Sequence, residues 1–322
     1  MKVGFLILCH TDPVHIGRLA RRLADTEQFY VLIHVDRKAE ETVFRREIPE
    51  SSQIRWIEER EDCKWGRMGT VRAELKLLEA GVGAGCDRLV LLQGLDYPLK
   101  SNEEILAFFR EHPETEYLRA CRISDSQDEY HYRRCRRYWM LNNSLPARLW
   151  NRLNDYHPFY IRSGCYRERK TSYPCYWGSA QWALTADCGA FILNFVKEHP
   201  GFVRYYSHIF PCDETFFASI LYNSAYMERT ATGGPEPEER YLVNWRNLHY
   251  FEYPKQIRIF REEDYEFLKR RPELFVRKVC TGQSDGLLHM LDEKAGWRDG
   301  RQTASDMRRT AGAHIKKGEE SS

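Results

Sequence analysis

The chain has 322 residues, of which 42% are hydrophobic and 30% charged, and its formal net charge is +2. This composition is typical of a folded globular protein and excludes a largely disordered chain. The near-neutral charge argues against a dedicated nucleic-acid-binding protein, which usually carries a strong basic excess.

The ten cysteines include no Cys-x-x-Cys pair, so a zinc ribbon or a thioredoxin-type motif is not supported. Cysteines in apolar runs, such as Cys9 and Cys188, are expected to be small buried side chains. The N-terminal segment is too short and too soon interrupted for a signal peptide or a membrane span. We therefore expect reduced thiols and a cytoplasmic protein.

The first half of the chain alternates strand and helix patterns. Continuous apolar runs predict buried strands at residues 2–9, 29–35 and 88–93. Apolar residues at helical spacing predict helices around residues 16–23, 67–80 and 102–111. Asp12 is a plausible N-cap of the first helix, with Pro13 at its first position. This alternation predicts a Rossmann-like α/β domain, in which helices flank a mostly parallel central sheet.

The second half is less regular. Residues 121–176 hold many Arg and Tyr and show no clear period, so we interpret them as a long insertion over the sheet within a single domain. After it, the pattern predicts a strand at 181–184, a helix ending near 196, a helix from Asp213 to Leu221, a strand at 247–253 and a helix at 262–270. We expect the domain to span 1–282 and a polar, partly disordered tail to span 283–322.

Polar residues follow three of the predicted strands. His10 follows the first strand, Asp36 the second, and residues 94–96 the third. Ligands of parallel sheets bind beyond the carboxyl ends of the strands, so these residues are expected to line one crevice. His10 is suited to a base edge or a phosphate and Asp36 to a base or ribose, although a lone His is more often structural.

Two adjacent carboxylates, Asp213 and Glu214, follow Pro211 at a predicted helix start. Asp213 is placed to cap the helix, and Glu214 would then project from the first turn into a cleft. An inverting sugar transfer needs one carboxylate that takes the proton of the acceptor hydroxyl, and Glu214 suits that role. The alternative is that both residues only cap a helix.

The sequence contains no Asp-x-Asp motif that would hold a divalent metal. Cationic side chains can stabilise a departing diphosphate instead of a metal. Arg246, Arg277 and Lys278 are candidates because apolar neighbours would anchor them. Taken alone, each of them fits an ordinary surface position on an edge strand better than a binding role. Glycine-rich dinucleotide and phosphate loops, the hydrolase Gly-x-Ser-x-Gly and the His-Glu-x-x-His zinc motif are also absent.

Basic and aromatic residues alternate over residues 130–139. Nucleic acid, an acceptor sugar or an anionic lipid would each fit this run, and the overall charge makes nucleic acid the weakest of the three. A second basic stretch, from Arg308 to Lys317, is expected to belong to the disordered tail, with lipid contact as the alternative.

Together these segments resemble the core-2/I-branching β-1,6-N-acetylglucosaminyltransferase family, which includes the protein O-xylosyltransferases. The resemblance covers roughly residues 1–280. It is carried by motifs in the family's order: ILCHTD near the start, HVDRKAE at 34–40, Trp-Gly at 65–66, LLQGLDYPLKS at 91–101, YWGSAQWALT at 176–185, PCDE at 211–214 and LFVRK at 274–278.

The resemblance implies a GT-A-like fold and an inverting glycosyltransferase that uses no metal. It implies that Glu214 is the catalytic base. The donor diphosphate would be contacted by Arg246 and Lys278, with Arg277 adjacent, and the uridine nucleotide by His10, Asp36 and Trp65. The expected sugar and acceptor side consists of Asp96, Gln181, Trp182 and Asp213. Gln181 stands where the xylosyltransferases carry Asp, which leaves the donor sugar open.

The expected reaction transfers a sugar, GlcNAc in β linkage, from a UDP-sugar to a hydroxyl of a glycan in polysaccharide or glycoconjugate synthesis. One alternative is a UDP-xylose-dependent xylosyltransferase, and another is an inactive sugar- or nucleotide-binding module. The chain resembles a compact bacterial member rather than the membrane-anchored eukaryotic ones. We therefore expect no metal cofactor, no nucleic-acid partner and a cytoplasmic location, with peripheral contact at the inner face of the membrane as a further option.

Overall fold

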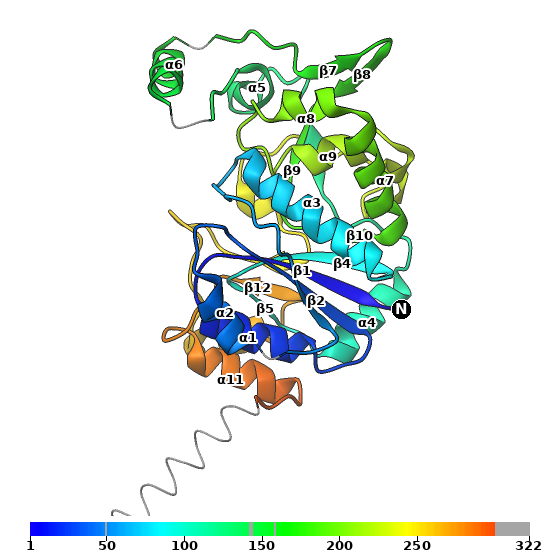
Figure 1. The fold of residues 1–322 in the computed structure, drawn as a ribbon, viewed down its shortest axis with the longest axis vertical. Helices are drawn as coiled ribbons and strands as arrows, with labels where there is room; N and C mark the ends of the chain where they lie inside the picture. The colour runs from blue at the N-terminus through cyan, green and yellow to red at the C-terminus, as the bar shows by residue number, and fades with distance from the viewer. Residues whose placement is uncertain (49, 142–143, 158, 300–322) are drawn as a thin grey trace, which may run out of the picture.

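The computed structural model describes residues 1–48, 50–141, 144–157 and 159–299. Its centre is a five-stranded sheet in the order β10–β4–β1–β2–β3 (Figure 1). The strands are β1 (Val3–Cys9), β2 (Phe29–Val35), β3 (Ile54–Trp56), β4 (Arg88–Gln93) and β10 (Ala183–Thr185). The first four run parallel, and β10 pairs antiparallel with β4. The predicted α/β class with a mostly parallel, Rossmann-like sheet is confirmed.

The central strands are buried on both faces. β1 pairs in register with β2 and β4, so Phe5 lies between Val31 and Val90. Phe5 belongs to one hydrophobic cluster, whereas the next residue, Leu6, belongs to a second cluster on the other face. Because successive side chains of a strand alternate between faces, both faces need apolar residues. This explains why the strands read as continuous apolar runs.

Each face of the sheet is covered by its own set of helices. One cluster takes residues from α1 (Pro13–Leu23), α2 (Glu41–Glu47), α4 (Asn102–Glu111) and α11 (Asp285–Lys294). The other takes residues from α3 (Met68–Gly83), α7 (Ala186–Glu198), α8 (Pro200–Tyr206) and α9 (Phe216–Leu221). The predicted start of α1 is confirmed: the Asp12 side chain accepts a hydrogen bond from the His15 backbone N–H, and Pro13 is the first helical residue.

A small three-stranded sheet continues from the carboxyl end of β4. It has the order β11 (His249–Tyr250), β12 (Phe275–Arg277), β5 (Asp96–Pro98). The turn from β4 to β5 passes Gly94, where a Cβ would lie 2.9 Å from the Cβ of Cys9. The register places Arg277 directly opposite Asp96. The strand predicted at 247–253 is thus only two residues long, because this edge is otherwise irregular.

The insertion is present, but it lies beyond α8 and α9 at one end of the molecule rather than over the sheet (top of Figure 1). At its base, β6 (Ala120–Arg122) pairs with β9 (Tyr176–Gly178). Its outer part contains α5 (Glu129–Arg136), α6 (Leu145–Tyr156), β7 (Cys165–Glu168) and β8 (Thr171–Pro174). The expected place of the insertion over the sheet was wrong, because its apolar residues pack on α8 and α9.

The prediction of a polar tail from residue 283 was wrong for residues 285–294, which form α11. α11 buries Leu287, Leu288 and Leu291 in the cluster beside α1. Asp292 is buried as well, and its carboxylate pairs with two arginines of α1 and accepts a hydrogen bond from the Tyr97 hydroxyl. The polar composition of this segment led to the tail prediction. In the fold, charged groups such as Asp292 are paired and buried. The stretch from Arg308 to Lys317 lies outside the described residues.

Several smaller boundaries also differ. The helix predicted from Asp213 begins only at Phe216, after a turn, and its N-cap is Thr215 without a side-chain capping bond. Asp213 is therefore not a cap. The helix predicted at 262–270 divides into η3 (Glu262–Asp264) and α10 (Tyr265–Leu268), and two further short helices are η1 (Ala225–Arg229) and η2 (Leu242–Trp245).

All ten cysteines are free thiols, and seven of them are buried. Over the described part of the chain, the helices are too short or too polar for any of them to span a bilayer.

Candidate active site

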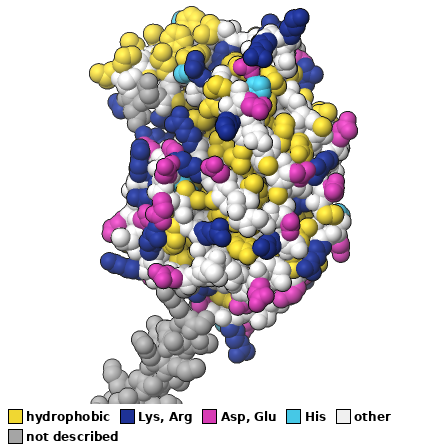
Figure 2. All heavy atoms as spheres, turned by 45° about the vertical axis from the view of Figure 1, so that its right-hand side comes forward, with side chains coloured by type: hydrophobic (Ala, Val, Ile, Leu, Met, Phe, Trp, Pro, Cys, Tyr) yellow, Lys and Arg dark blue, Asp and Glu magenta, His cyan; other side chains and the backbone are white. Residues whose placement is uncertain are grey.

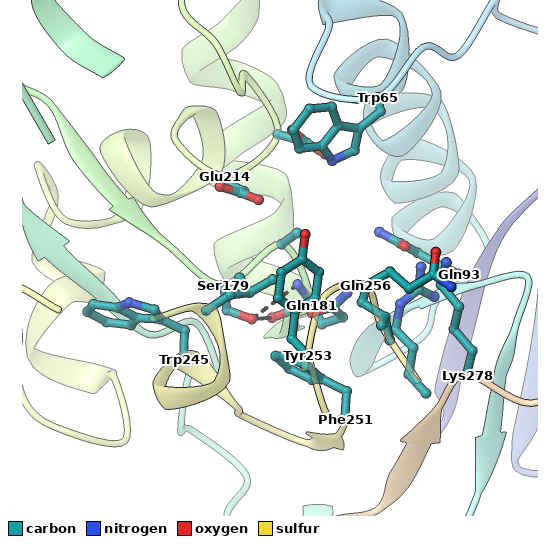
Figure 3. A pocket seen from close by; sticks show the side chains of 15 residues that line it. Trp65, Gln93, Ser179, Gln181, Glu214, Trp245, Phe251, Tyr253, Gln256 and Lys278 are labelled. Carbon is teal, nitrogen blue, oxygen red and sulfur yellow. Dashed lines mark hydrogen bonds between the residues drawn. The ribbon is translucent and has the colours of Figure 1, made fainter. Parts of the chain in front are cut away.

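Two adjoining pockets lie beyond the carboxyl ends of β1, β2 and β4. The strand-end pocket, of about 320 Å³, is lined by residues that follow these strands, among them His10, Asp36 and Gly94. The aromatic pocket, of about 270 Å³, contains Glu214 and Gln181. The two pockets form one continuous crevice, because both are lined by Trp65, Gln93, Asp213, Arg277 and Lys278. Figure 3 shows the aromatic pocket.

The polar residues that follow the predicted strands lie together in the strand-end pocket, as expected from the sequence. His10 is exposed, whereas Asp36 is buried and accepts hydrogen bonds from the Lys38 backbone N–H at 2.9 Å and from its ammonium at 2.8 Å. Trp65 is 70% exposed and packs edge-on against Phe210 with ring centroids 4.9 Å apart. An aromatic face, a carboxylate and an imidazole thus border a space that continues toward two cations.

Those cations are Arg277 at the end of β12 and Lys278 after it. One Arg277 nitrogen, Nη1, donates to Asp96 at 2.7 Å, while the buried Nε has no hydrogen-bond partner. The Lys278 ammonium has no hydrogen-bond or ion-pair partner within the described ranges. Burial, and then the neighbouring Arg277 charge, lower the pKa of Lys278. The pair therefore presents donors that an anion in the crevice would satisfy.

Asp96 does not line either pocket. It lies fully buried beneath them, where it accepts a hydrogen bond from the Gln93 backbone N–H and lies 3.2 Å from the His249 ring. Burial by itself would raise the pKa of Asp96, but the charges of Arg277 and His249 lower it to about 2. The structure therefore gives this predicted sugar-side residue a different place: it fixes Arg277 from below.

Glu214 reaches the aromatic pocket from the turn before α9 and is only 8% exposed. Its Oε2 accepts a hydrogen bond from the Trp177 indole N–H at 2.7 Å. Burial raises the pKa of Glu214, and the Arg134 charge and the Trp177 hydrogen bond partly offset this rise. In Figure 3, Glu214 and Trp65 lie along one side of the pocket, across from Gln181, Tyr253 and Lys278. A buried carboxylate of raised pKa, open to a pocket, suits a general base.

A second and a third carboxyl group lie behind Glu214. Asp213 lines both pockets, and its buried Oδ1 has no hydrogen-bond partner. Burial, and then the charge of Glu214, raise the pKa of Asp213 to about 7. Glu74 of α3 is buried with both carboxylate oxygens unpartnered, and burial, with a further contribution from Asp213, raises its pKa well above the usual range. The pKa values of all three carboxyl groups are therefore raised above their usual range.

Besides Asp96, two further predicted residues do not line the crevice. The guanidinium of Arg246 stacks over the Tyr250 ring at 4.4 Å, and its Nε donates to the Phe251 carbonyl. Trp182 is 1% exposed and packs against Phe217 in the core, with ring centroids 5.3 Å apart. Gln181 does line the aromatic pocket, in a turn closed by Ser179.

Other residues of the crevice were missed from the sequence. Trp177, which donates a hydrogen bond to Glu214, belongs to the WGSA motif, and this motif could have pointed to it. In the same motif, a Cβ on Gly178 would lie 1.9 Å from the Arg119 carbonyl oxygen, so only glycine lets β9 approach β6 this closely. No local sequence pattern predicts that Trp245, Phe251 and Tyr253 form an aromatic wall of the pocket, because they come from irregular segments.

Several arginines of the basic and aromatic run at 130–139 stack on aromatic rings of the protein itself. Arg134 stacks on Tyr130 at 4.1 Å and on Trp177 at 4.8 Å. Arg136 and Arg137 likewise stack on rings of the same run. Arg134 thereby links the insertion to the hydrogen-bond partner of Glu214. Elsewhere, His, Cys, Asp and Glu side chains do not gather in groups of three or more that could hold a metal ion, as far as the described residues extend.

Comparison with known proteins gives a family match and distant relatives. The family model described as "Branch: Core-2/I-Branching enzyme" matches residues 3–269, a stretch that includes Glu214 and Arg246 and ends before Arg277. Human "Xylosyltransferase 2" is 21% identical over 314 residues, which cover 91% of this chain and 33% of that protein. The chain thus spans about a third of the length of this curated relative.

Solved structures are similar only at low scores. Mouse xyloside xylosyltransferase 1 in its apo form is 13% identical, with a TM-score of 0.31 over 69% of this chain and 83% of that one. Mannose-1-phosphate geranyltransferase from Thermus thermophilus is 15% identical, with a TM-score of 0.32 over 74% of this chain and 69% of that one.

Proposed function

The chain belongs to the core-2/I-branching enzyme family of glycosyltransferases. From this membership and from the geometry of the crevice, we propose that it transfers a sugar from a UDP-sugar to a glycan hydroxyl by a single inverting displacement. The observation that carries the proposal is the placement of Glu214. Its carboxylate opens into the same pocket that Arg277 and Lys278 line. A base and two cations thus border one space.

The nucleotide binds in the strand-end pocket. Its base and ribose lie near His10, Asp36 and Trp65, and its diphosphate lies toward Arg277 and Lys278. As the bond between the sugar and the diphosphate breaks, negative charge grows on the leaving phosphate. Cationic donors that are already in place stabilise this charge without reorganising, because Asp96 holds Arg277 from below. These two side chains take the role that a divalent metal has in other transferases.

The acceptor hydroxyl binds in the aromatic pocket. The Trp177 N–H holds Oε2 of Glu214, which leaves Oε1 for the proton of the acceptor hydroxyl. The deprotonated oxygen attacks the anomeric carbon from the face opposite the diphosphate, so the configuration inverts. One carboxylate suffices for this reaction, because the diphosphate leaves without a proton. Rings such as Tyr253 and Trp245 provide apolar surfaces for a pyranose face.

We propose GlcNAc as the transferred sugar and polysaccharide or glycoconjugate synthesis as the setting. Xylose is the second candidate, because the human relative is a xylosyltransferase. Gln181 and Ser179 line the pocket near Glu214, and their polar groups are positioned to distinguish a sugar that carries an acetamido group from one without it.

A thermal-shift panel tests the proposal. The protein is melted with UDP-GlcNAc, UDP-xylose, UDP-glucose, UDP-galactose and GDP-mannose, each with and without EDTA. A ligand that binds only the folded state stabilises it by about 2.7 kcal/mol at a hundred times its Kd. We expect one UDP-sugar to raise the melting temperature equally in EDTA. A response that EDTA abolishes, or one seen only with GDP-mannose, would contradict the metal-free uridine site.

The same panel includes a matched pair of variants. Lys278→Ala should weaken the response to UDP about tenfold or more, because it removes a charge from the diphosphate. Lys269→Ala, which removes a surface ion pair with Glu266, should leave the response intact. An unchanged UDP affinity in Lys278→Ala would contradict the assigned role.

A further inference from the structure

Helix α6 of the insertion is amphipathic with its polar face inward. Asn154 is fully buried and donates to the Tyr138 carbonyl, while its Oδ1 accepts from the Phe159 backbone N–H. Asn151 bonds the backbone of Met140 through both ends of its amide. The helix is therefore docked by hydrogen bonds. Ordinary surface helices of globular proteins dock by an apolar stripe and present their polar face to water.

The opposite face of α6 carries a ridge of leucines. Leu145, Leu149 and Leu153, four residues apart, are 79%, 61% and 52% exposed. Large hydrophobic residues are otherwise rarely exposed here: of the eleven such residues among those described, six belong to this helix and the segment after it. These six form the outer apolar surface, which consists of Leu145, Leu149, Leu153, Tyr156, Phe159 and Ile161.

The outer apolar surface lies at the end of the molecule farthest from α11 (Figure 1). Figure 2 shows hydrophobic side chains gathered at this end, with Lys and Arg side chains close by. No other described element covers this face of α6, since its leucines are exposed. A contiguous apolar patch of this kind marks a contact site for a partner or a membrane.

The charge around this surface is strongly positive. Residues 129–170 carry ten Arg and Lys against three Asp and Glu, in a chain whose net charge is only +2. Arg148 and Arg152 are exposed on α6 itself, three residues after Leu145 and Leu149. Arginines on the border of an apolar helix face can extend toward lipid phosphates while the aliphatic side chains enter the bilayer.

We propose that the outer apolar surface docks the protein onto an anionic lipid membrane. The leucine ridge enters the boundary between headgroups and acyl chains, and the surrounding arginines pair with the lipid phosphates. Charge complementarity favours lipid over a second copy of the chain, because two copies meeting at this surface would bring like charges together. The inference is independent of the donor and of the mechanism proposed above.

Vesicle co-sedimentation of the full chain tests the proposal. The protein is mixed with vesicles of phosphatidylcholine alone or of phosphatidylcholine with phosphatidylglycerol. We expect binding to the anionic vesicles, weaker binding to the neutral ones, and release from the anionic vesicles as salt is raised. Leu149→Glu with Leu153→Glu should lower partitioning at least about tenfold, because two aliphatic side chains leave the bilayer. Val14→Glu changes an exposed aliphatic residue of α1 and should bind as the parent does.

A charge-reversal pair separates the two contributions. Arg148→Glu with Arg152→Glu should lower binding to anionic vesicles about tenfold and leave the weak binding to neutral vesicles unchanged. All substituted side chains are exposed, so melting temperatures should stay close to that of the parent. If the parent chain does not bind anionic vesicles, or if the double leucine variant binds equally well, the proposal is overturned. A dimer that the leucine changes dissociate, without vesicle binding, would assign the surface to a second copy instead.

Discussion

The sheet region, residues 1–111, and the outer part of the insertion, which contains α5 and α6, are held together by different means. In the sheet region, β1, β2 and β4 bury apolar side chains on both faces, and the helices add apolar stripes. In the outer insertion, arginines stack on rings, as Arg137 does on Trp139 at 3.7 Å, and asparagines dock α6. Burial of apolar area drives the first arrangement, and directional polar contacts specify the second.

The two regions therefore have different roles. The sheet region fixes strand ends, and with them the nucleotide side of the crevice, within a tightly packed core. On α6 of the insertion, polar contacts anchor the helix, and its leucines are left exposed. The two regions meet at Glu214, which Trp177 at the base of the insertion holds by a hydrogen bond. The predictions below test how far chemistry and anchoring can be separated.

The largest expected effect is the loss of activity on substitution of Glu214, where the two regions meet. Glu214→Gln keeps the shape and the acceptor for the Trp177 N–H but removes the base, so kcat should fall about 10²–10⁴-fold while donor binding persists. Steady-state transfer rates and UDP-sugar titrations measure the two quantities. Glu266→Gln on the exposed surface is the matched control. A Glu214→Gln enzyme with a near-parental rate would refute the assignment of the base.

The docking of α6 is the next test. Asn154→Leu removes both hydrogen bonds of a buried side chain, so we expect α6 to lose about 1–3 kcal/mol of local stability. Hydrogen exchange should then accelerate over 145–156 and remain slow in β1, β2 and β4. Asn194→Leu, at an exposed position of α7, should change neither. Equal acceleration in the sheet would mean that the two regions unfold as one unit.

A third prediction concerns the buried carboxyl group of Glu74 and its effect on the stability of the sheet region. Its pKa is raised by burial, so between the unfolded value and the folded one the unfolded chain releases a proton that the folded chain keeps. Stability therefore falls as pH rises through this interval. Glu74→Leu removes the loss, and we expect it to stabilise the protein by about 1–3 kcal/mol near pH 8 and by less near pH 5. Denaturant unfolding at both pH values measures this gain.

Glu79→Leu, an exposed position on the same helix, is the control for Glu74→Leu and should show no pH-dependent gain. A Glu74→Leu chain that is less stable than the parent at both pH values would indicate that the carboxyl group has a partner, and the explanation by unpartnered burial would fail.

The smallest effect concerns pH. A base must be ionised, and burial raises the pKa of Glu214, so activity should decline as pH falls through that pKa. Burial, and then the charge of Glu214, raise the pKa of Asp213 to about 7, so Asp213 is still neutral where Glu214 ionises. Asp213→Asn should therefore leave the acidic limb of kcat/KM close to its position in the parent. A limb that moves to lower pH in this variant would show that a charged Asp213 raises the pKa of Glu214.

Local patterns in the sequence determined much of the sheet region. The strand at 29–35, the strand at 88–93 and the helix at 102–111 were predicted with the bounds that the structure has. The Asp12 cap and the strand-end crevice also follow from the sequence, because turn chemistry and strand order depend on neighbours along the chain. Glu214 and Lys278 were placed by motif, and both line the aromatic pocket; their chemical roles remain predictions.

Tertiary structure alone decided the rest. Asp96 sits beneath Arg277, Trp182 fills the core, Arg246 stacks on Tyr250, and Glu74 lies behind Asp213, all through contacts between residues distant in sequence. The residues of α6 lie in a stretch without a clear period, and those of α11 were predicted to belong to a polar tail, so neither helix was predicted. The sequence alone cannot show that the leucines of α11 are buried and those of α6 exposed, because burial depends on what the rest of the chain packs against each helix.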